Sequence, residues 1–177
     1  MIDDDATPDS SNNHEPVIRE AGLSDLPAIR SLACRIWPEA YGEILSAAQI
    51  AYMLEQSYTL SALEKQLHSG NIFLIALLGE TPVGFASYAS TQDPSVYKTH
   101  KLYVLSSIQK KGIGRSLLEI IFKNARLAGA TVVQLNVNRN NKARFFYEKL
   151  GFRSIKEEDI PIGQGFFMND YVMEKNI

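Results

Sequence analysis

The chain has 177 residues, 45% hydrophobic and 21% charged, which is the size and balance of one globular domain. Its net charge of −2 provides no basic excess for nucleic acid, and no apolar run reaches the roughly 18 residues of a membrane span. Its one cysteine, Cys34, excludes an internal disulfide, and the histidines show no metal-ligand spacing, so we expect no metal.

The N-terminal stretch MIDDDATPDSSNNHEP is acidic and polar. It lacks the basic start and apolar core of a signal peptide, which favours a cytoplasmic protein. We expect residues 1–15 to form a disordered acidic tail and residues 16–177 to form a single domain.

A short strand is predicted over Val17–Glu20, followed by three helices. Ser24 is the expected N-cap of the first helix, and Pro38 is expected to end it. The pattern Ser46-x-x-Gln49 is typical of a capping box and predicts a second helix to about residue 55. A third helix is predicted over residues 61–68, where leucines recur on one side.

The rest of the chain alternates between strand and helix patterns. Strands are predicted at 72–78, 83–88, 98–105, 131–137, 152–156 and 166–174, with helices at 112–128 and 140–150. The first two of these strands form an expected antiparallel hairpin. The order predicts an α/β fold, a mixed sheet of about seven strands with helices on both faces.

The segment Gln109-Lys110-Lys111-Gly112-Ile113-Gly114-Arg115 separates a strand from the helix that follows it. A helix N-terminus offers free backbone N–H groups, and glycines let a ligand approach the main chain closely. Together with the positive end of the helix dipole and the nearby basic side chains, these groups are typical of an anion site. We therefore expect a phosphorylated ligand here.

Two familiar phosphate motifs do not match this segment. A P-loop needs a glycine five residues before a Gly-Lys-Ser/Thr run, whereas Gly114 is followed by Arg115 and has no such glycine before it. A dinucleotide fingerprint needs a third glycine where this chain has Leu117, which is too large for close packing of helix on strand.

The segment resembles the pyrophosphate loop, Q/R-x-x-G-x-G/A, of the GNAT superfamily of acetyl-CoA-dependent N-acetyltransferases. A second run, from Asn140 through Ala143 and Tyr147 to Gly151-Phe152, is similar to the family signature N-x-x-A-x-x-x-Y-x-x-x-G-F. The resemblance covers residues 17–174, and the N-terminal helices are loosely similar to those of bacterial polyamine and small-amine acetyltransferases. It implies the GNAT-like acyl-CoA N-acyltransferase fold.

The resemblance also implies how acetyl-CoA would be held. The strand ending at Val104 would pair with the pantetheine arm, and a backbone N–H near Val104 would polarise the acetyl carbonyl. The glycine loop would wrap the diphosphate, and Asn140 would hydrogen-bond the cofactor arm. The expected cofactor-binding residues are Leu102, Tyr103, Val104, Gln109, Lys110, Lys111, Gly112, Ile113, Gly114, Arg115, Asn140 and Ala143.

Acetyl transfer needs an acid for the departing thiolate and a base for the incoming ammonium. By resemblance, Tyr147 is the expected general acid, although its spacing alone would also suit a core residue. Many relatives carry a glutamate where this chain has His100, which is the expected base; a surface or structural role is the alternative. Others use a glutamate at the position of Asn136, which cannot act as a base.

The acceptor pocket is expected to include an aromatic wall with Trp37 and Tyr41. Acidic side chains that could attract a cationic amine are Glu39, Glu43, Asp159 and Asp170, although such residues usually face solvent. The predicted function is transfer of acetyl from acetyl-CoA to a primary amine of a small molecule, with polyamines as one candidate. The alternatives are a protein or peptide N-acetyltransferase and a non-catalytic acyl-CoA sensor. A homodimer is left open.

Overall fold

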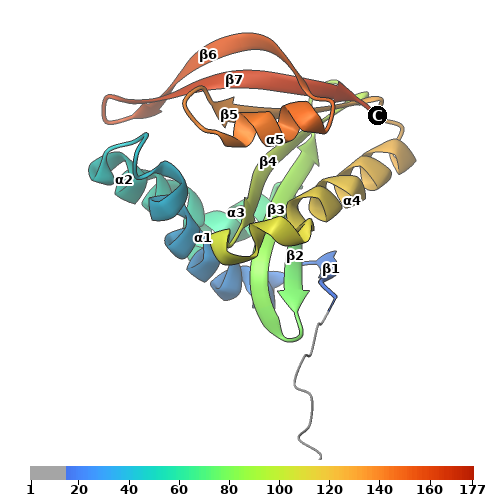
Figure 1. Cartoon of the computed structure of the whole chain (residues 1–177), viewed down its shortest axis with the longest axis horizontal. Helices are drawn as coiled ribbons and strands as arrows, with labels where there is room; N and C mark the ends of the chain where they lie inside the picture. Colours follow the sequence, from blue (N-terminus) through green and yellow to red (C-terminus); the bar gives the residue numbers. More distant parts are fainter. Residues whose placement is uncertain (1–14) are drawn as a thin grey trace, which may run out of the picture.

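A computed structural model describes residues 15–177, so the expected acidic tail lies, except for Glu15, outside the described residues. Seven strands, five α-helices and two short 3₁₀ turns follow one another within this range (Figure 1). In chain order they are β1 (Val17–Glu20), η1 (Leu23–Asp25), α1 (Leu26–Tyr41), α2 (Ala47–Tyr58), α3 (Leu60–His68), β2 (Ile72–Leu78), β3 (Thr81–Ser90), β4 (Val96–Val104), η2 (Ser106–Lys111), α4 (Ile113–Leu127), β5 (Val132–Asn138), α5 (Ala143–Lys149), β6 (Arg153–Gly163) and β7 (Phe166–Asn176).

The strands form one mixed sheet in the order β1-β2-β3-β4-β5-β7-β6. All neighbouring pairs are antiparallel except β4 and β5, which run parallel. This parallel pairing spans only four residue pairs and ends at Thr99 opposite Leu135. Beyond that point β4 and β5 no longer pair with each other, so the sheet opens between them. The predicted α/β fold with about seven strands is confirmed.

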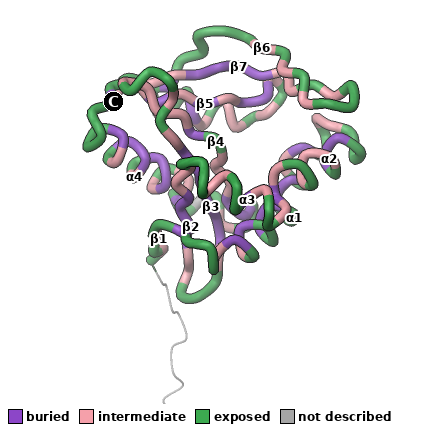
Figure 2. Tube along the Cα trace, turned by 180° about the vertical axis from the view of Figure 1, so that it is seen from behind, coloured by how far each residue is buried: buried purple, intermediate pink, exposed green. Residues whose placement is uncertain are grey.

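Helices cover both faces of the central strands. Phe85 of β3 packs edge-on against Tyr58 of α2, whereas Tyr88, three residues along the same strand, accepts a hydrogen bond from Asn124 of α4. Because side chains alternate across a strand, these two contacts lie on opposite faces. Helix α5 lies on the same face of the sheet as α4, because Phe122 of α4 and Tyr147 of α5 both contact Phe152. Burial is deepest along these layers, and β6 at the edge is mostly exposed (Figure 2).

Several expectations about element ends were wrong. Ser24 does not cap the first helix: it lies inside η1, and Asp25 is the N-cap residue of α1. Pro38 does not end the first helix: α1 continues to Tyr41 with Pro38 inside its last turn. A proline removes one backbone donor, and near the C-terminus of a helix that loss interrupts few bonds. Strand β6 runs to Gly163 rather than residue 156 and includes Pro161. An edge strand tolerates proline because one side of its ladder has no partner.

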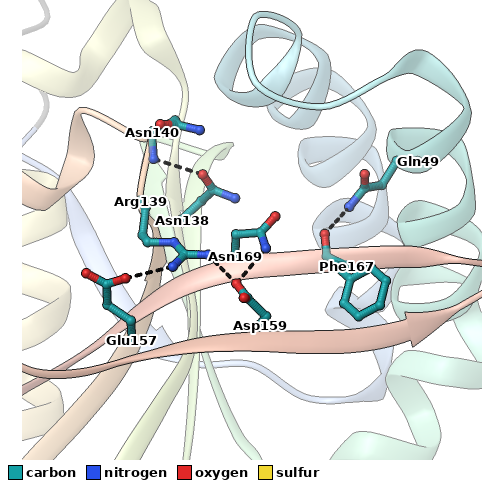
Figure 3. Close-up of polar contacts among 8 residues, drawn as sticks. All are labelled: Gln49, Asn138, Arg139, Asn140, Glu157, Asp159, Phe167 and Asn169. Carbon is teal, nitrogen blue, oxygen red and sulfur yellow. Dashed lines mark hydrogen bonds and ion pairs between the residues drawn. The ribbon is translucent and has the colours of Figure 1, made fainter.

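The hairpin of β6 and β7 is attached to α2. The buried Gln49 side chain donates to the Phe167 carbonyl at 2.7 Å (Figure 3), and the Tyr52 hydroxyl donates to the Ile162 carbonyl at 2.7 Å. Gln49 was expected to complete a capping box, and its backbone N–H does bond the Ser46 hydroxyl at 3.1 Å. These bonds fix the tip of the hairpin against the N-terminal helices. None of the helices between residues 15 and 177 is long and apolar enough to cross a membrane.

Candidate active site

A cleft of about 540 Å³ lies where β4 and β5 separate. It is lined by the end of β4, the first turn of α4, the start of α5 and the last turn of α1. The lining residues are Ile36, Glu39, Ala40, Tyr41, Leu102, Tyr103, Val104, Ser106, Gln109, Gly112, Gly114, Arg115, Val137, Asn141, Lys142, Ala143, Phe146 and Tyr147.

One wall of the cleft is the unpaired edge of β4. On its other edge this strand is bonded to β3, where Ala86, Phe85 and Gly84 face Leu102, Tyr103 and Val104. The Leu105 N–H points to β3 and bonds the Val83 carbonyl at 2.9 Å. Successive N–H groups of a strand point to opposite edges, so the Val104 N–H points into the cleft. An extended ligand can therefore pair with this edge as an additional strand would.

The first turn of α4 forms the end of the cleft. Gly112 adopts the left-handed conformation, with φ +76° and ψ 4°, and the chain turns there from η2 into the helix. Ile113 is fully buried and anchors the turn. The first intrahelical bond runs from the Ser116 N–H to the Gly112 carbonyl at 3.0 Å, so the amides before it are available to a ligand. Arg115 lines the cleft and also pairs with Glu119 at 2.9 Å.

Three tyrosines gather at the inner part of the cleft. The hydroxyls of Tyr41 and Tyr103 lie 3.2 Å apart and share a hydrogen bond. Tyr147 is 8% exposed, and its pKa is raised by burial and, secondarily, by Tyr41. Burial likewise raises the pKa of both Tyr41 and Tyr103. All three phenols therefore keep their protons at neutral pH, and each is available as a hydrogen-bond or proton donor.

The structure brings together most of the residues predicted from the sequence. Among the expected cofactor and catalytic residues, the cleft is lined by Leu102, Tyr103, Val104, Gln109, Gly112, Gly114, Arg115, Ala143 and Tyr147, and by Tyr41 of the expected aromatic wall. Outside this lining lie Lys111, Asn140, Trp37 and the buried Ile113. Asn141, rather than Asn140, faces the cleft. Trp37 packs behind the wall, against Tyr41, Tyr58 and Tyr103.

His100, the expected base, does not line the cleft. Its neighbours Thr99 and Lys101 pair with Tyr88 and Ser87, so His100 is the extra residue of a bulge in β4. The pKa of His100 falls to about 4, first because neighbouring atoms partly desolvate the ring and second because Lys101 and Lys98 repel a positive charge. The imidazole is therefore neutral at pH 7 and only weakly basic.

Sequence reasoning named Tyr41 and Glu39 in the last turn of α1 but missed Ile36 and Ala40. These residues reach the cleft from a helix about 60 residues before β4. Glu39 accepts a hydrogen bond from the Ser106 hydroxyl at 2.6 Å, which ties α1 to the loop after β4. No local pattern marks these residues, because the contact depends on how the helices pack on the sheet.

The arrangement suits a long ligand with a phosphorylated end. The strand edge can hold an extended arm, the helix N-terminus can hold an anion, and the phenols lie near the inner end of the arm. Among residues 15–177, no three His, Cys, Asp or Glu side chains are grouped as metal ligands would be.

Comparison with known proteins agrees with this geometry. The model of the acetyltransferase (GNAT) domain matches residues 43–174. The structure of PaiA N-acetyltransferase from Thermoplasma acidophilum, in complex with coenzyme A, is 25% identical, with a TM-score of 0.78 over 92% of this chain and 99% of that one. None of the curated proteins matches.

Two further solved structures show the same fold. A GCN5-related N-acetyltransferase from Rhodopseudomonas palustris is 22% identical with a TM-score of 0.78, over 92% of this chain and 96% of that one. The ribosomal-protein-S18-alanine N-acetyltransferase from Escherichia coli is 18% identical with a TM-score of 0.69, over 92% and 94%. The family model spans well over half of the sequence, and the chain therefore belongs to the GNAT family of acetyl-CoA-dependent N-acetyltransferases.

Proposed function

We propose that this enzyme transfers the acetyl group of acetyl-CoA to a primary amine of a small molecule, with polyamines as one candidate class, and that Tyr147 is the general acid. One observation carries the proposal. A single cleft joins the unpaired edge of β4, the N-terminus of α4 and Tyr147. These are the elements needed to hold an extended thioester and to protonate its leaving group.

The cofactor would lie along the cleft from the helix to the tyrosines. Its diphosphate would accept hydrogen bonds from the amides of the first turn of α4, with Arg115 adding positive charge. Its pantetheine arm would pair with Leu102–Val104, and the Val104 N–H would polarise the acetyl carbonyl. Gln109 supports this edge, since its Nε2 donates to the Val104 carbonyl at 3.3 Å.

Tyr147 suits the role of acid because it is buried and protonated. The departing thiolate needs a proton, and a phenol can supply one at neutral pH. Burial raises the pKa of Tyr147, and the same dry surroundings would raise that of the thiolate. Donor and acceptor therefore remain matched inside the cleft.

The attachment of the β6–β7 hairpin to α2 favours a small acceptor. Hydrogen bonds from Gln49 and Tyr52 to the hairpin backbone close the space between the tip of the hairpin and α2. A peptide acceptor needs an open groove along which its chain can lie. The closed side therefore argues for a compact amine rather than a protein.

The test is a thiol-release assay with acetyl-CoA and a panel of amines, comparing the wild type with Tyr147→Phe. We expect kcat to fall about 10²–10⁴-fold, the usual contribution of a general acid, with unchanged coenzyme A affinity in calorimetry. Tyr97→Phe is the matched control, because this phenol lies outside the cleft, and its kcat should stay near wild type.

Two results would contradict the proposal. Full activity in Tyr147→Phe would remove this residue as the acid. Coenzyme A binding without turnover of any amine would favour an acyl-CoA sensor instead of an enzyme.

A further inference from the structure

We propose that the carboxylate of Asp170 receives the ammonium group of the acceptor and takes its proton, an inference that rests on the acetyl transfer proposed above. Asp170 lies on β7, opposite Asn138 of β5. It belongs to neither family signature in the sequence. The structure sets it apart from the other acidic residues of the same hairpin.

Asp170 is a buried carboxylate without a cationic partner among the described residues. It is 6% exposed, and its Oδ1 atom has no hydrogen-bond partner within residues 15–177. Its Oδ2 accepts one long hydrogen bond, 3.4 Å, from the Asn136 amide. An unpaired buried charge is unfavourable for folding, so a carboxylate kept in this state needs another explanation.

The neighbouring acids of β6 are all paired. Glu157 and Asp159 both bond Arg139, and Asp159 also accepts a hydrogen bond from Asn169 at 2.6 Å (Figure 3). Glu158 pairs with Lys156 at 2.5 Å. These residues already have partners, whereas the charge of Asp170 remains available for a cation from outside the chain.

A second acceptor lies beside Asp170. The Oδ1 atom of Asn136 is also buried and has no hydrogen-bond partner in the described part of the chain. Two neighbouring oxygen acceptors, one of them charged, match a group that has several N–H donors and a positive charge. A primary ammonium has these properties.

Asp170 lies beside the cleft rather than among its lining residues. Val137 lines the cleft, and the next residue, Asn138, is the cross-strand partner of Asp170. The Asn141 N–H bonds the Asn138 carbonyl at 2.9 Å, and Asn141 itself lines the cleft.

The charged groups around Asp170 come from several elements. Lys98 of β4 and Arg139, directly after β5, favour its ionised form, while Glu158 of β6 opposes it. The Asn136 amide also favours ionisation, but burial is the larger effect, and the net result is a raised pKa. A carboxylate that is harder to ionise than usual is a better proton acceptor.

The protons balance over one reaction. The ammonium, R–NH₃⁺, gives one proton to the Asp170 carboxylate and becomes R–NH₂. The amine lone pair forms the C–N bond at the acetyl carbonyl, and the C–S bond breaks. The thiolate takes the Tyr147 proton, and the second proton of the nitrogen restores that phenol. Asp170 then releases its proton to solvent, which gives amide, free thiol and one H⁺.

The experiment compares the wild type, Asp170→Asn and Glu157→Gln. The acceptors are n-butylamine and spermidine, together with O-propylhydroxylamine, an analogue of n-butylamine that is already neutral at pH 7. For Asp170→Asn we expect kcat/KM to fall at least about 10²-fold with the alkylamines but only slightly with O-propylhydroxylamine. Coenzyme A affinity should stay unchanged. Glu157→Gln, the control on a paired acid of β6, should retain wild-type activity with all acceptors.

Wild-type activity of Asp170→Asn with every acceptor would overturn the proposal for this residue while leaving the acetyl transfer intact. An equal loss with alkylamines and O-propylhydroxylamine would also overturn it, because it would indicate a structural role. A wild-type enzyme that acetylates none of the amines would refute the proposed function, and this inference with it.

A second measurement needs no variant and therefore does not depend on the folding of Asp170→Asn. In the wild type, the acidic limb of kcat/KM for n-butylamine should lie several pH units below the amine's own pKa of about 10, because the carboxylate takes the proton. A limb that follows the amine's own pKa would show that only free amine from solution reacts, and would overturn the proposal.

Discussion

Gly112 offers a direct test of how the glycine loop holds the cofactor. It adopts φ +76°, and a Cβ built there would meet no atom within 4 Å. Gly112→Ala therefore introduces backbone strain without a steric clash. The left-handed conformation costs an L-residue about 1–2 kcal/mol. For a domain of this size, that corresponds to a melting temperature lower by roughly 2–8 °C.

The same strain should appear in cofactor binding. The strain counts once, on folding or on binding. A free loop that keeps the left-handed turn lowers the melting temperature, whereas a free loop that relaxes must regain the turn on binding, and the Kd for coenzyme A then rises by up to about 5- to 30-fold. Gly112→Asn should lose less affinity, because asparagine tolerates this conformation better than alanine. Isothermal titration calorimetry measures both effects.

Gly70→Ala is the matched control for this test. Gly70 has φ +94°, also with no atom within 4 Å of a built Cβ, but it lies after α3 and outside the cleft. It should show a similar fall in melting temperature and no change in Kd. A Gly112→Ala variant with both wild-type stability and wild-type affinity would refute the role of this turn in binding.

Two further predictions concern the stability of the fold. Native His100, with a pKa of about 4, resists protonation, whereas the unfolded chain protonates near 6.5; stability is therefore lost as the pH falls from about 6.5 towards 4. As the pH falls through this window, the melting temperature of His100→Gln should fall less than that of the wild type. His68→Gln is the control. A plot of melting temperature against pH for His100→Gln that runs parallel to those of the wild type and His68→Gln would contradict this reasoning. In Gly84→Ala, the new Cβ would lie 2.9 Å from the Tyr103 carbonyl oxygen, so we expect a loss of about 1–3 kcal/mol in denaturant unfolding. Gly22→Ala, with open space around its Cβ, should unfold like the wild type, and equal effects of the two changes would refute the steric argument.

The sequence predicted the fold well because its elements carry local signals. β1 and β2 match the predicted ranges, and Ser46 caps α2 as the spacing indicated. The exposed edge strand β6 was predicted too short because its charges and Pro161 give no alternation of apolar and polar residues. Its pairing with β7 depends on the completed sheet rather than on local sequence.

The cofactor side of the site was predictable for the same reason, since two contiguous motifs carry it. The acceptor side was not, because it depends on contacts between distant segments. Trp37 and Tyr41 were expected to form one wall, but only Tyr41 faces the cleft. Asp170 lacks an ion-pair partner because β7 pairs with β5 at this point and because every acidic residue of β6 is bonded to a basic side chain. The acidic residues of the sequence alone show neither contact.

The most direct test of the account is a crystal structure of the protein with coenzyme A. We predict that the diphosphate accepts hydrogen bonds from the main-chain amides at the first turn of α4, and that the pantetheine arm runs along Leu102–Val104. The cofactor sulfur should lie within hydrogen-bonding reach of the Tyr147 hydroxyl. Density for coenzyme A in another part of the molecule, or a sulfur far from Tyr147, would contradict the account.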